Sequence, residues 1–410
     1  MSRLDDLISE LCPDGVEFKK LNLVCKIYDG THSTPDYKES GVKFVSVENI
    51  GNLYATTKYI SEEAFEKYKI KPQIDDVLMT RIGSIGVCTV VDREEPLAYY
   101  VSLALLRPDT KIIMSKYLKY IIESKYGRKE LRRRTLVNAV PIKINKDDIG
   151  KIVIPVPPLE VQREIVQILD KFTLLTAELT AELTARRKQY DYYGNMLFEG
   201  IDDKTEIHKV GDVISSLKTG LNPRKNFTLN EPGACYPYIT GKDIFDNQIN
   251  VTEKTDMITP QALELINKRA QLEKGLLLFA STGTGTVGRM AIIDEYKNNW
   301  GMSETLYGIK VDESVILPQY LMYFLYSVAA RKQFEPKITK GSVPHLKVKD
   351  LLNVKIPVPS VEMQKNIVDI LSRFDKLCNG MMEGLPAEID ARNKQYEYYR
   401  DKLLTFKEAV

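Results

Sequence analysis

Two short patterns in the chain contain residues that could do chemistry. In the first, Asp109 follows a proline and precedes Glu123 and Lys125, which is the PD…ExK pattern of metal-dependent nucleases. Two carboxylates at such a site would bind Mg²⁺, and the lysine would help to activate a water molecule. That chemistry places the glutamate and the lysine on a strand, whereas residues 117–122 have the apolar spacing of a helix. The competing interpretation is a solvated helix end.

The second pattern is the glycine run at residues 283–288, which has the spacing of a dinucleotide-binding fingerprint. That fingerprint needs a helix after the glycines, because the helix N-terminus holds the pyrophosphate. Residues 289–294 are instead typical of a strand, and the other half of the chain has only Gly83 and Gly86 at the matching place. We expect a turn between two strands. It is either a structural hairpin or one whose amides and hydroxyls approach DNA.

Other catalytic and metal-binding patterns are absent from the sequence. His32, His208 and His345 lie far apart, and no nucleophile elbow, phosphate-binding lysine motif or methyltransferase motif occurs. The five cysteines are odd in number and form no CxxC pair, which is typical of reduced thiols. We therefore expect no catalytic residues and no metal site in this chain.

The elements that carry these residues occur twice. Two blocks recur closely: residues 154–158 as residues 356–360, and residues 186–193 as residues 392–399. Upstream the match is weaker: residues 77–86 correspond to residues 276–285, and residues 140–141 to residues 343–344. Each copy is thus a variable body followed by a well-matched tail.

Each tail is predicted to be a helix. Apolar residues recur every three or four positions from Leu159 to about Phe198. At ~1.5 Å per residue this helix would be roughly 60 Å long, and its apolar stripe needs a partner, for which the other tail is the candidate. Two ordinary core helices are the alternative. Gly380, Gly384 and Pro386 interrupt the second tail, so we expect a kink or short turn there.

The bodies are predicted to be mixed α/β (α+β). Strands are expected at residues 42–47, 87–91, 236–239 and 290–293, and helices at residues 115–124 and 318–331. The predicted boundaries are residues 1–157 for the first body, 158–199 for its helix, 200–359 for the second body and 360–410 for its helix. No signal-peptide pattern or membrane-spanning run is present, so the cytoplasm is the expected compartment.

Local clusters of charge, not the overall balance, point to nucleic acid. With 58 basic and 56 acidic residues the net charge is only +2. Candidate phosphate contacts are Arg132, Arg133, Arg134, Lys218, Arg224, Lys225, Lys337 and Lys340. Candidate base contacts are Thr31, His32, Ser33, Tyr37, Asn222, Lys242 and again Arg224, with Arg81, Ser84, Ser281, Thr282 and Thr284 on the glycine-containing turns. For each single residue a solvated surface position is the alternative.

The tails resemble the repeat regions of specificity subunits of type I restriction–modification enzymes. The resemblance lies in residues 154–158, in the helix start at residues 162–172 and in the RKQYxYY block at residues 187–193. Residues 175–183 (LTAELTAEL) are similar to the four-residue repeats in the central helix of the IC class. The architecture matches over the whole chain, whereas the specific motifs lie in the tails.

The resemblance implies two target recognition domains that each read half of an asymmetric, bipartite site in double-stranded DNA, as part of a defence against foreign DNA. The two long helices would pair antiparallel as a coiled-coil spacer with pseudo-twofold symmetry and dock two modification (methyltransferase) subunits, which restriction subunits with translocase and nuclease activity join. S-adenosylmethionine, ATP and Mg²⁺ would belong to those partners and none to this chain. Candidate docking residues are Gln162, Phe172, Gln189, Tyr190, Tyr193, Gln364, Phe374, Gln395, Tyr396 and Tyr399.

Overall fold

The computed structural model describes residues 3–201, 205–379 and 384–409. Its contacts divide the chain into two compact units, of which unit 1 comprises Met1–Glu178 and Ile389–Val410, and unit 2 comprises Leu179–Glu388. Helix α7 (Leu159–Glu199) therefore begins in unit 1 and ends in unit 2. Unit 1 also takes in most of helix α14 (Leu385–Leu403), the last helix of the chain.

Unit 1 is built on a four-stranded antiparallel sheet in the order β2-β8-β5-β6. These strands are β2 (Cys25–Asp29), β5 (Val77–Thr80), β6 (Cys88–Val90) and β8 (Leu103–Pro108). A second sheet contains β3 (Val42–Val45), β4 (Tyr59–Ile60) and β7 (Leu97–Tyr99), and β1 (Phe18–Lys20) pairs with β9 (Val153–Pro155). The helices are α1 (Arg3–Leu11), α2 (Leu21–Val24), α3 (Glu62–Glu66), α4 (Ser115–Glu123), α5 (Lys125–Arg134) and α6 (Lys146–Gly150), with 3-10 turns η1 (Val47–Asn49) and η2 (Leu53–Ala55).

Unit 2 repeats this topology, with a four-stranded sheet in the order β11-β19-β16-β17. These strands are β11 (Ile214–Thr219), β16 (Leu277–Ala280), β17 (Met290–Ile292) and β19 (Leu306–Val311). The smaller sheets contain β10 (Ile207–Lys209), β12 (Tyr236–Ile239), β13 (Ile244–Phe245), β14 (Gln248–Ile249), β15 (Met257–Ile258), β18 (Gly301–Met302) and β20 (Lys355–Pro357). The helices are α8 (Pro223–Asn226), α9 (Pro260–Arg269), α10 (Pro318–Tyr326), α11 (Val328–Phe334), α12 (Val348–Leu352) and α13 (Val361–Asn379), with η3 (Val210–Asp212), η4 (Gly241–Asp243) and η5 (Glu335–Lys337).

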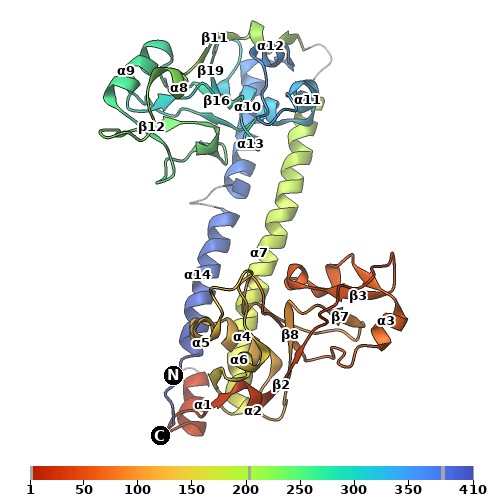
Figure 1. Cartoon of the computed structure of the whole chain (residues 1–410). Coiled ribbons are helices and arrows are strands. Elements are labelled where there is room, and N and C mark those ends of the chain that lie inside the picture. The colour runs from red at the N-terminus through yellow and green to blue at the C-terminus, as the bar shows by residue number, and fades with distance from the viewer. Residues whose placement is uncertain (1–2, 202–204, 380–383, 410) are drawn as a thin grey trace. The chain divides into compact units, whose positions relative to one another are not determined.

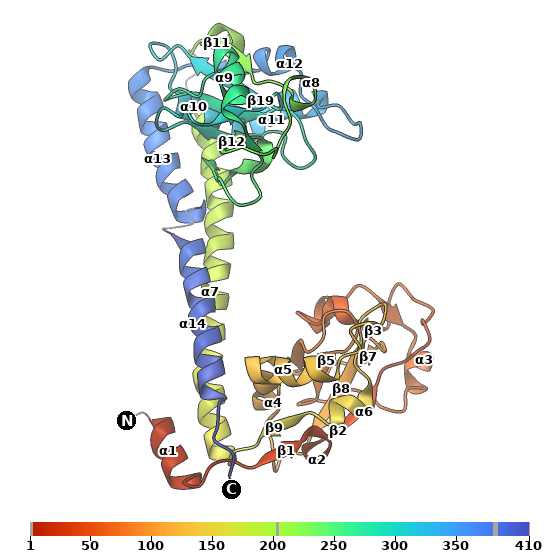
Figure 2. The same ribbon diagram turned by 60° about the vertical axis from the view of Figure 1, so that its left-hand side comes forward.

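The central sheet of each unit is covered on both faces, because side chains along a strand alternate in direction. On β5, Val77 and Met79 join the core formed with helix α4, whereas Leu78 joins the core formed with β3 and β7. Figure 2 shows the two layers, with α4 and α5 on one side of β5 and β8 and with β3, β7 and α3 on the other. On β16 of unit 2, Phe279 and Leu278 point to the two matching cores.

Two buried glutamines fasten the tail helices to these cores. Gln162 accepts a hydrogen bond from the Met114 amide (2.9 Å) and donates to the carbonyls of Ile112 (2.9 Å) and Pro157 (2.7 Å). In unit 2, Gln364 makes the same three bonds to the main chain of Leu317, Val315 and Pro359. Both side chains are fully buried.

Most of the predicted elements are confirmed. Helix α7 has nearly the predicted bounds, and the predicted strands appear as β3, β6, β12 and β17. The helix expected at residues 318–331 is divided at Ser327 into α10 and α11 (Figure 1). The second tail forms α13 and α14, and the predicted interruption at Gly380 lies outside the described residues. Within those residues, no helix is long and apolar enough to cross a membrane.

Candidate nucleic-acid interface

Three loops meet at one edge of the central sheet in each unit. Strands β2 and β5 both pair antiparallel with β8, so they run in the same direction. Their last residues, Asp29 and Thr80, lie opposite neighbouring positions at the start of β8, so the loops that follow leave the sheet at the same edge. In unit 2, Thr219 of β11 and Ala280 of β16 have the same relation to β19.

The loop after β5 is joined to a third loop by main-chain hydrogen bonds. The Gly83 amide donates to the Ile142 carbonyl (2.9 Å), and in unit 2 the Gly283 amide donates to the Pro344 carbonyl (3.0 Å). We call these pairs of loops tip 1 (residues 81–86 and 135–144) and tip 2 (residues 281–288 and 338–346). Thr282 and His345 share a further hydrogen bond of 2.8 Å across tip 2.

The structure of tip 2 decides between a dinucleotide-binding fingerprint and a turn between two strands for the glycine run. The run connects β16 to the antiparallel strand β17, so the dinucleotide-binding interpretation is wrong and the predicted turn is confirmed. The alignment of Gly86 with Gly285 is also wrong. Gly86 donates to the Thr80 carbonyl, and its counterpart is Gly288, which donates to the Ala280 carbonyl. Both glycines have positive φ, 88° and 87°, and the loop of tip 2 is the longer one.

Two predicted DNA contacts lie inside the protein. Arg81 is 7% exposed, forms an ion pair with Asp29 and donates from Nε to the Ile144 carbonyl (3.1 Å). Arg81 thus links the loop after β2 to residues 81–86 and 135–144 of tip 1. Its guanidinium is already bound by Asp29 and by the Ile144 carbonyl. Ser281 is fully buried, and its hydroxyl donates to the Thr305 carbonyl (2.9 Å). Both side chains shape the edge and do not offer a surface for DNA.

The remaining candidates in unit 1 lie on the three loops or beside them. His32 and Ser33 are exposed on the loop after β2, where Thr31 is half-buried and Tyr37 is 42% exposed. Ser84 is exposed at tip 1. The loop after β2 also borders an open cleft of about 900 Å³. Its walls carry the lysines Lys38, Lys67, Lys69 and Lys146, the acids Asp29, Asp36 and Glu63, and the tyrosines Tyr28, Tyr68 and Tyr99. Lys38 forms an ion pair with Asp36, so the positive charge of this cleft is largely balanced.

Helix α5 carries the arginine cluster directly into tip 1. Arg132 and Arg133 are exposed, and Arg134 is half-buried. The buried carboxylate of Glu130 binds Arg133 (2.6 Å) and Arg134 (2.8 Å). Burial by itself would raise the pKa of Glu130, but the hydrogen bonds from the two arginines outweigh it and the pKa is lowered. The cluster therefore holds its arginines in place and keeps a positive excess at the sheet edge.

In unit 2 the predicted residues also surround the shared edge. Asn222 caps helix α8 through the Arg224 amide (2.9 Å), which leaves Arg224 and Lys225 exposed. Lys242 binds Asp256 (2.6 Å) next to Gly241, whose neighbours are Ala280 and Thr286 of the glycine loop. Thr284 and Lys340 are exposed on tip 2. Lys218 is exposed on β11, and Lys337 is exposed in η5, which follows α11.

Sequence analysis missed the apolar part of tip 1. Leu136, Val137, Val140 and Ile142 are exposed large apolar residues within one short loop, and Val140 is 100% exposed. Tip 2 has the exposed Val343 next to Pro344. Because Pro344 accepts from Gly283 as Ile142 accepts from Gly83, Val343 corresponds to Pro141, and the alignment of Val140 with Val343 is wrong by one residue. The recurrence of Val-Pro in both copies was the only signal in the sequence. Exposed apolar side chains beside arginines are suited to contact base edges in a groove.

The nuclease pattern does not form a site in the described residues. Asp109 precedes α4 and binds the Lys111 amide (3.1 Å), whereas Glu123 is the last residue of α4 and accepts from the Cys88 amide (2.9 Å). The nine-residue helix α4, roughly 14 Å long, lies between them in the chain, and the two carboxylates bind different main-chain amides. Burial raises the pKa of Glu123. No cluster of three or more metal-binding side chains occurs in the part of the chain that the structure describes.

The predicted docking residues fall into two groups. Gln162 and Gln364 are enclosed in their own units, which leaves no part of these side chains for a partner subunit. The aromatic residues instead pair between tail helices. Phe172 stacks on Tyr399 in unit 1 (5.4 Å), and Tyr190 and Tyr193 pack on Phe374 in unit 2. Gln189 and Gln395 are exposed, and Tyr396 packs against Tyr120.

Helices α7 and α13 run antiparallel within unit 2. Arg187 reaches the carbonyl of Cys378 (3.4 Å), Tyr193 stacks on Phe374 (6.1 Å), and Gly194 faces Leu371. Residue numbers thus rise along one helix as they fall along the other.

Comparisons with known proteins agree with this architecture. The profile of the family described as "Type I restriction modification DNA specificity domain" matches residues 13–186 and 202–391. The Escherichia coli EcoR124I/EcoR124II type I restriction enzyme specificity subunit is 36% identical over 267 residues, which are 62% of this chain and 63% of that subunit. A putative type I restriction enzyme specificity subunit of Haemophilus influenzae, S.HindORF215P, is 34% identical over 303 residues, 68% of this chain and 74% of that protein.

Two solved structures share the fold. The S subunit of a type I restriction-modification system from M. genitalium is 15% identical, with a TM-score of 0.57 over 95% of this chain and 96% of its own. A chain from a structure concerning complex assembly and conformational transition of the type I restriction–modification system is 17% identical. Its TM-score is 0.59 over 96% of this chain and 98% of its own.

Proposed function

Because the chain belongs to the family of type I restriction–modification DNA specificity domains, we propose that it is the DNA-reading, non-catalytic subunit of such an enzyme. The observation that carries the proposal is the three-loop sheet edge, which both units build with the same main-chain bonds and with different side chains. A shared scaffold with unlike donors and acceptors is what two different half-sites require. The target is therefore bipartite and asymmetric.

Each edge has a positioning part and a base-contacting part. In unit 1, Arg132, Arg133 and Arg134 contact phosphates, and His32 and Ser84 face base edges with the exposed valines of tip 1. In unit 2, Lys337 and Lys340 contact phosphates, while Arg224 and Thr284 face bases.

Neutralising Arg132, Arg133 and Arg134 together tests the DNA-reading role. Binding of duplex DNA by the assembled enzyme should weaken at low salt. The slope of log K against the logarithm of the salt concentration should fall by about 0.9 for each phosphate that the variant no longer neutralises. The matched control is Lys188→Ala on the exposed surface of α7. An unchanged salt slope in the triple variant, with the fold intact by circular dichroism, would refute phosphate contact by this cluster.

The tail helices serve as the spacer and the docking surface. Their aromatic pairs and antiparallel course in unit 2 support a coiled-coil pairing of the tails with pseudo-twofold symmetry, on which two modification subunits bind and restriction subunits join. S-adenosylmethionine, ATP and Mg²⁺ belong to those partners. We place the complex in the cytoplasm, where it meets foreign DNA.

Deleting residues 180–183, one Thr-Ala-Glu-Leu unit, tests the spacer. The deletion removes about one helical turn, or ~6 Å, which is close to two base-pair steps of ~3.4 Å. Mapping of methylated adenines should show a shorter gap between the half-sites. Methylation at the original gap would contradict the spacer role.

A further inference from the structure

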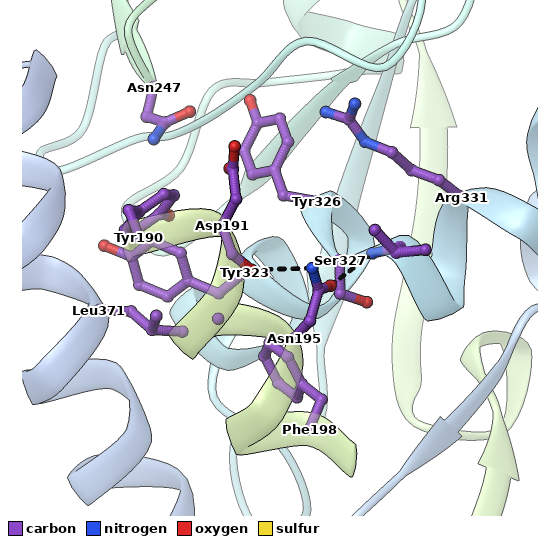
Figure 3. Close-up of a pocket in the computed structure, with 12 residues that line it drawn as sticks. Tyr190, Asp191, Asn195, Phe198, Asn247, Tyr323, Tyr326, Ser327, Arg331 and Leu371 are labelled. Atoms are coloured by element: carbon purple, nitrogen blue, oxygen red, sulfur yellow. Dashed lines mark hydrogen bonds between the residues drawn. The ribbon is translucent and has the colours of Figure 1, made fainter. Parts of the chain in front are cut away.

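Unit 2 contains a cleft of about 340 Å³ between the end of α7 and the two helices α10 and α11. Figure 3 shows Asn195 in this cleft beside Ser327 and Phe198, with the rings of Tyr190 and Tyr323 together near Leu371 and with Tyr326 and Arg331 on a further side. Asn195 accepts a hydrogen bond from the Val328 amide at the start of α11 (2.9 Å) and donates to the Asp191 carbonyl (2.8 Å). Burial raises the pKa of Tyr326 to about 12.

Unit 1 contains a cleft at the repeat-related place. There Asp401 of α14 accepts a hydrogen bond from the Lys125 amide at the start of α5 (2.9 Å), as Asn195 does from Val328. This shared cap fixes the correspondence of the two clefts. Their lining residues pair as Tyr396 with Tyr190, Glu397 with Asp191, Glu123 with Tyr326, and Arg128 with Arg331.

The clefts differ at the residue before the cap. In unit 1 this residue is Arg400, whose guanidinium lies 5.3 Å from the centre of the Tyr396 ring and 3.3 Å from Asp401. Arg400 is only 5% exposed. In unit 2 the matching residue is Gly194, which supplies no side chain to cover the ring of Tyr190.

Neither the backbone nor the packing of α7 requires a glycine at position 194. Its φ is not positive, and an added Cβ would lie 3.7 Å from Leu371 Cδ2, which is an ordinary contact. A glycine inside a helix destabilises it relative to alanine. Residues that are unfavourable for their local secondary structure cluster at functional positions. A glycine within α7 therefore indicates that the open space beside Tyr190 serves binding.

We propose that the cleft of unit 2 is a socket for an arginine side chain of one modification subunit, which takes the place that Arg400 fills in unit 1. The inference rests on the proposed docking of modification subunits and specifies its chemistry. A planar guanidinium stacks on tyrosine rings, and the exposed Asp191 at the rim supplies a carboxylate. The resident Arg331 lies near Glu335 (3.9 Å) and 5.8 Å from the Tyr326 ring centre.

The socket has a consequence for assembly. Two copies of one modification subunit meet two clefts, of which the cleft of unit 1 already contains its own arginine. Only the copy on unit 2 inserts its arginine, so the two copies bind with unequal affinity.

Filling the socket tests the proposal. Full-length chain carrying Gly194→Arg is titrated with purified modification subunit and followed by native mass spectrometry. The wild-type chain should bind two copies, and the variant should bind the copy on unit 1 unchanged and the copy on unit 2 at least tenfold more weakly. Gly194→Ala is the matched control, since it adds only a Cβ for which there is room, and it should bind both copies as the wild type does.

A second pair of variants tests the charge. Asp191→Asn should weaken binding of the copy on unit 2 and reduce the salt dependence of that binding, whereas Glu397→Gln in unit 1 should leave the copy on unit 2 unaffected. If wild type, Gly194→Arg and Asp191→Asn all bind two copies with the same affinities, the arginine socket is refuted, whereas the docking role of the chain is not. A wild-type chain that binds no modification subunit would overturn both.

Discussion

The glutamine at the start of helix α7 allows a quantitative test of how a tail helix is held by its unit. Gln162→Ala removes one acceptor and two donors from buried surroundings. The Met114 amide and the carbonyls of Ile112 and Pro157 then lose their partner. An unsatisfied buried polar group costs about 1–3 kcal/mol, and a carbonyl that finds another partner costs less, so we expect unit 1 to lose about 3 kcal/mol of unfolding free energy.

Differential scanning calorimetry measures this loss. A unit of about 200 residues shifts its melting temperature by ~2–4 °C per kcal/mol, so the transition of unit 1 should fall by ~6–12 °C. Gln364→Ala removes the equivalent three bonds in unit 2 and should lower the other transition by a similar amount. The control is Gln167→Ala on the exposed face of α7 within unit 1. If Gln162→Ala moves the unit 1 transition no further than Gln167→Ala does, the main-chain bonds of Gln162 do not anchor the helix.

Three further predictions concern the sheet edges. Because the pKa of Glu130 is lowered in the folded chain, its contribution to stability is complete above the unfolded value and is lost as pH falls through the folded value. The stability advantage of wild type over Glu130→Gln in urea unfolding should therefore shrink between about pH 6 and about pH 3, and a constant difference would contradict the ion pairs. An added Cβ at Gly30 or at Gly220 would overlap the carbonyl oxygen of Tyr100 or of Met302. Each alanine variant should reduce recognition of its own half-site only, and Gly51→Ala, which meets nothing within 4 Å, is the control. Val140→Ser should leave the melting temperature within about 1 °C, as exposed substitutions do, and should weaken DNA binding; unchanged affinity would remove Val140 from the interface.

The repeats and the long helix could be predicted from the sequence because each depends on the types and spacing of residues that are near one another in the chain. Apolar spacing along residues 159–199 predicts α7, and the recurrence of the 154–158 block predicts two similar units. The turn between β16 and β17 followed from the strand pattern on both sides of the glycine run.

The state of single side chains could not be predicted, because it depends on partners that are distant in the chain. Arg81 looked like a DNA contact beside two glycines, yet Asp29 and Ile144 bind its guanidinium. Gln162 was predicted to be a docking residue, yet its own unit encloses its side chain. Gly86 was also paired with the wrong glycine, because residues 77–86 and 276–285 were aligned without a gap although the loop of tip 2 is longer. The structure pairs Gly86 with Gly288.

The division of the chain into units has a consequence for the order in which they fold during synthesis. Unit 2 is one continuous segment, so all its contacts are available once residue 388 has left the ribosome. Unit 1 needs the last residues of the chain, since Val16 exchanges main-chain hydrogen bonds with Lys407 and Ala409, and Leu404 is buried in its core. Almost four hundred residues are therefore synthesised between Val16 and the C-terminal residues that pair with it. The N-terminal half should become resistant to protease only after residues 404–409 have left the ribosome, later than unit 2, which reverses the usual order for a multidomain protein.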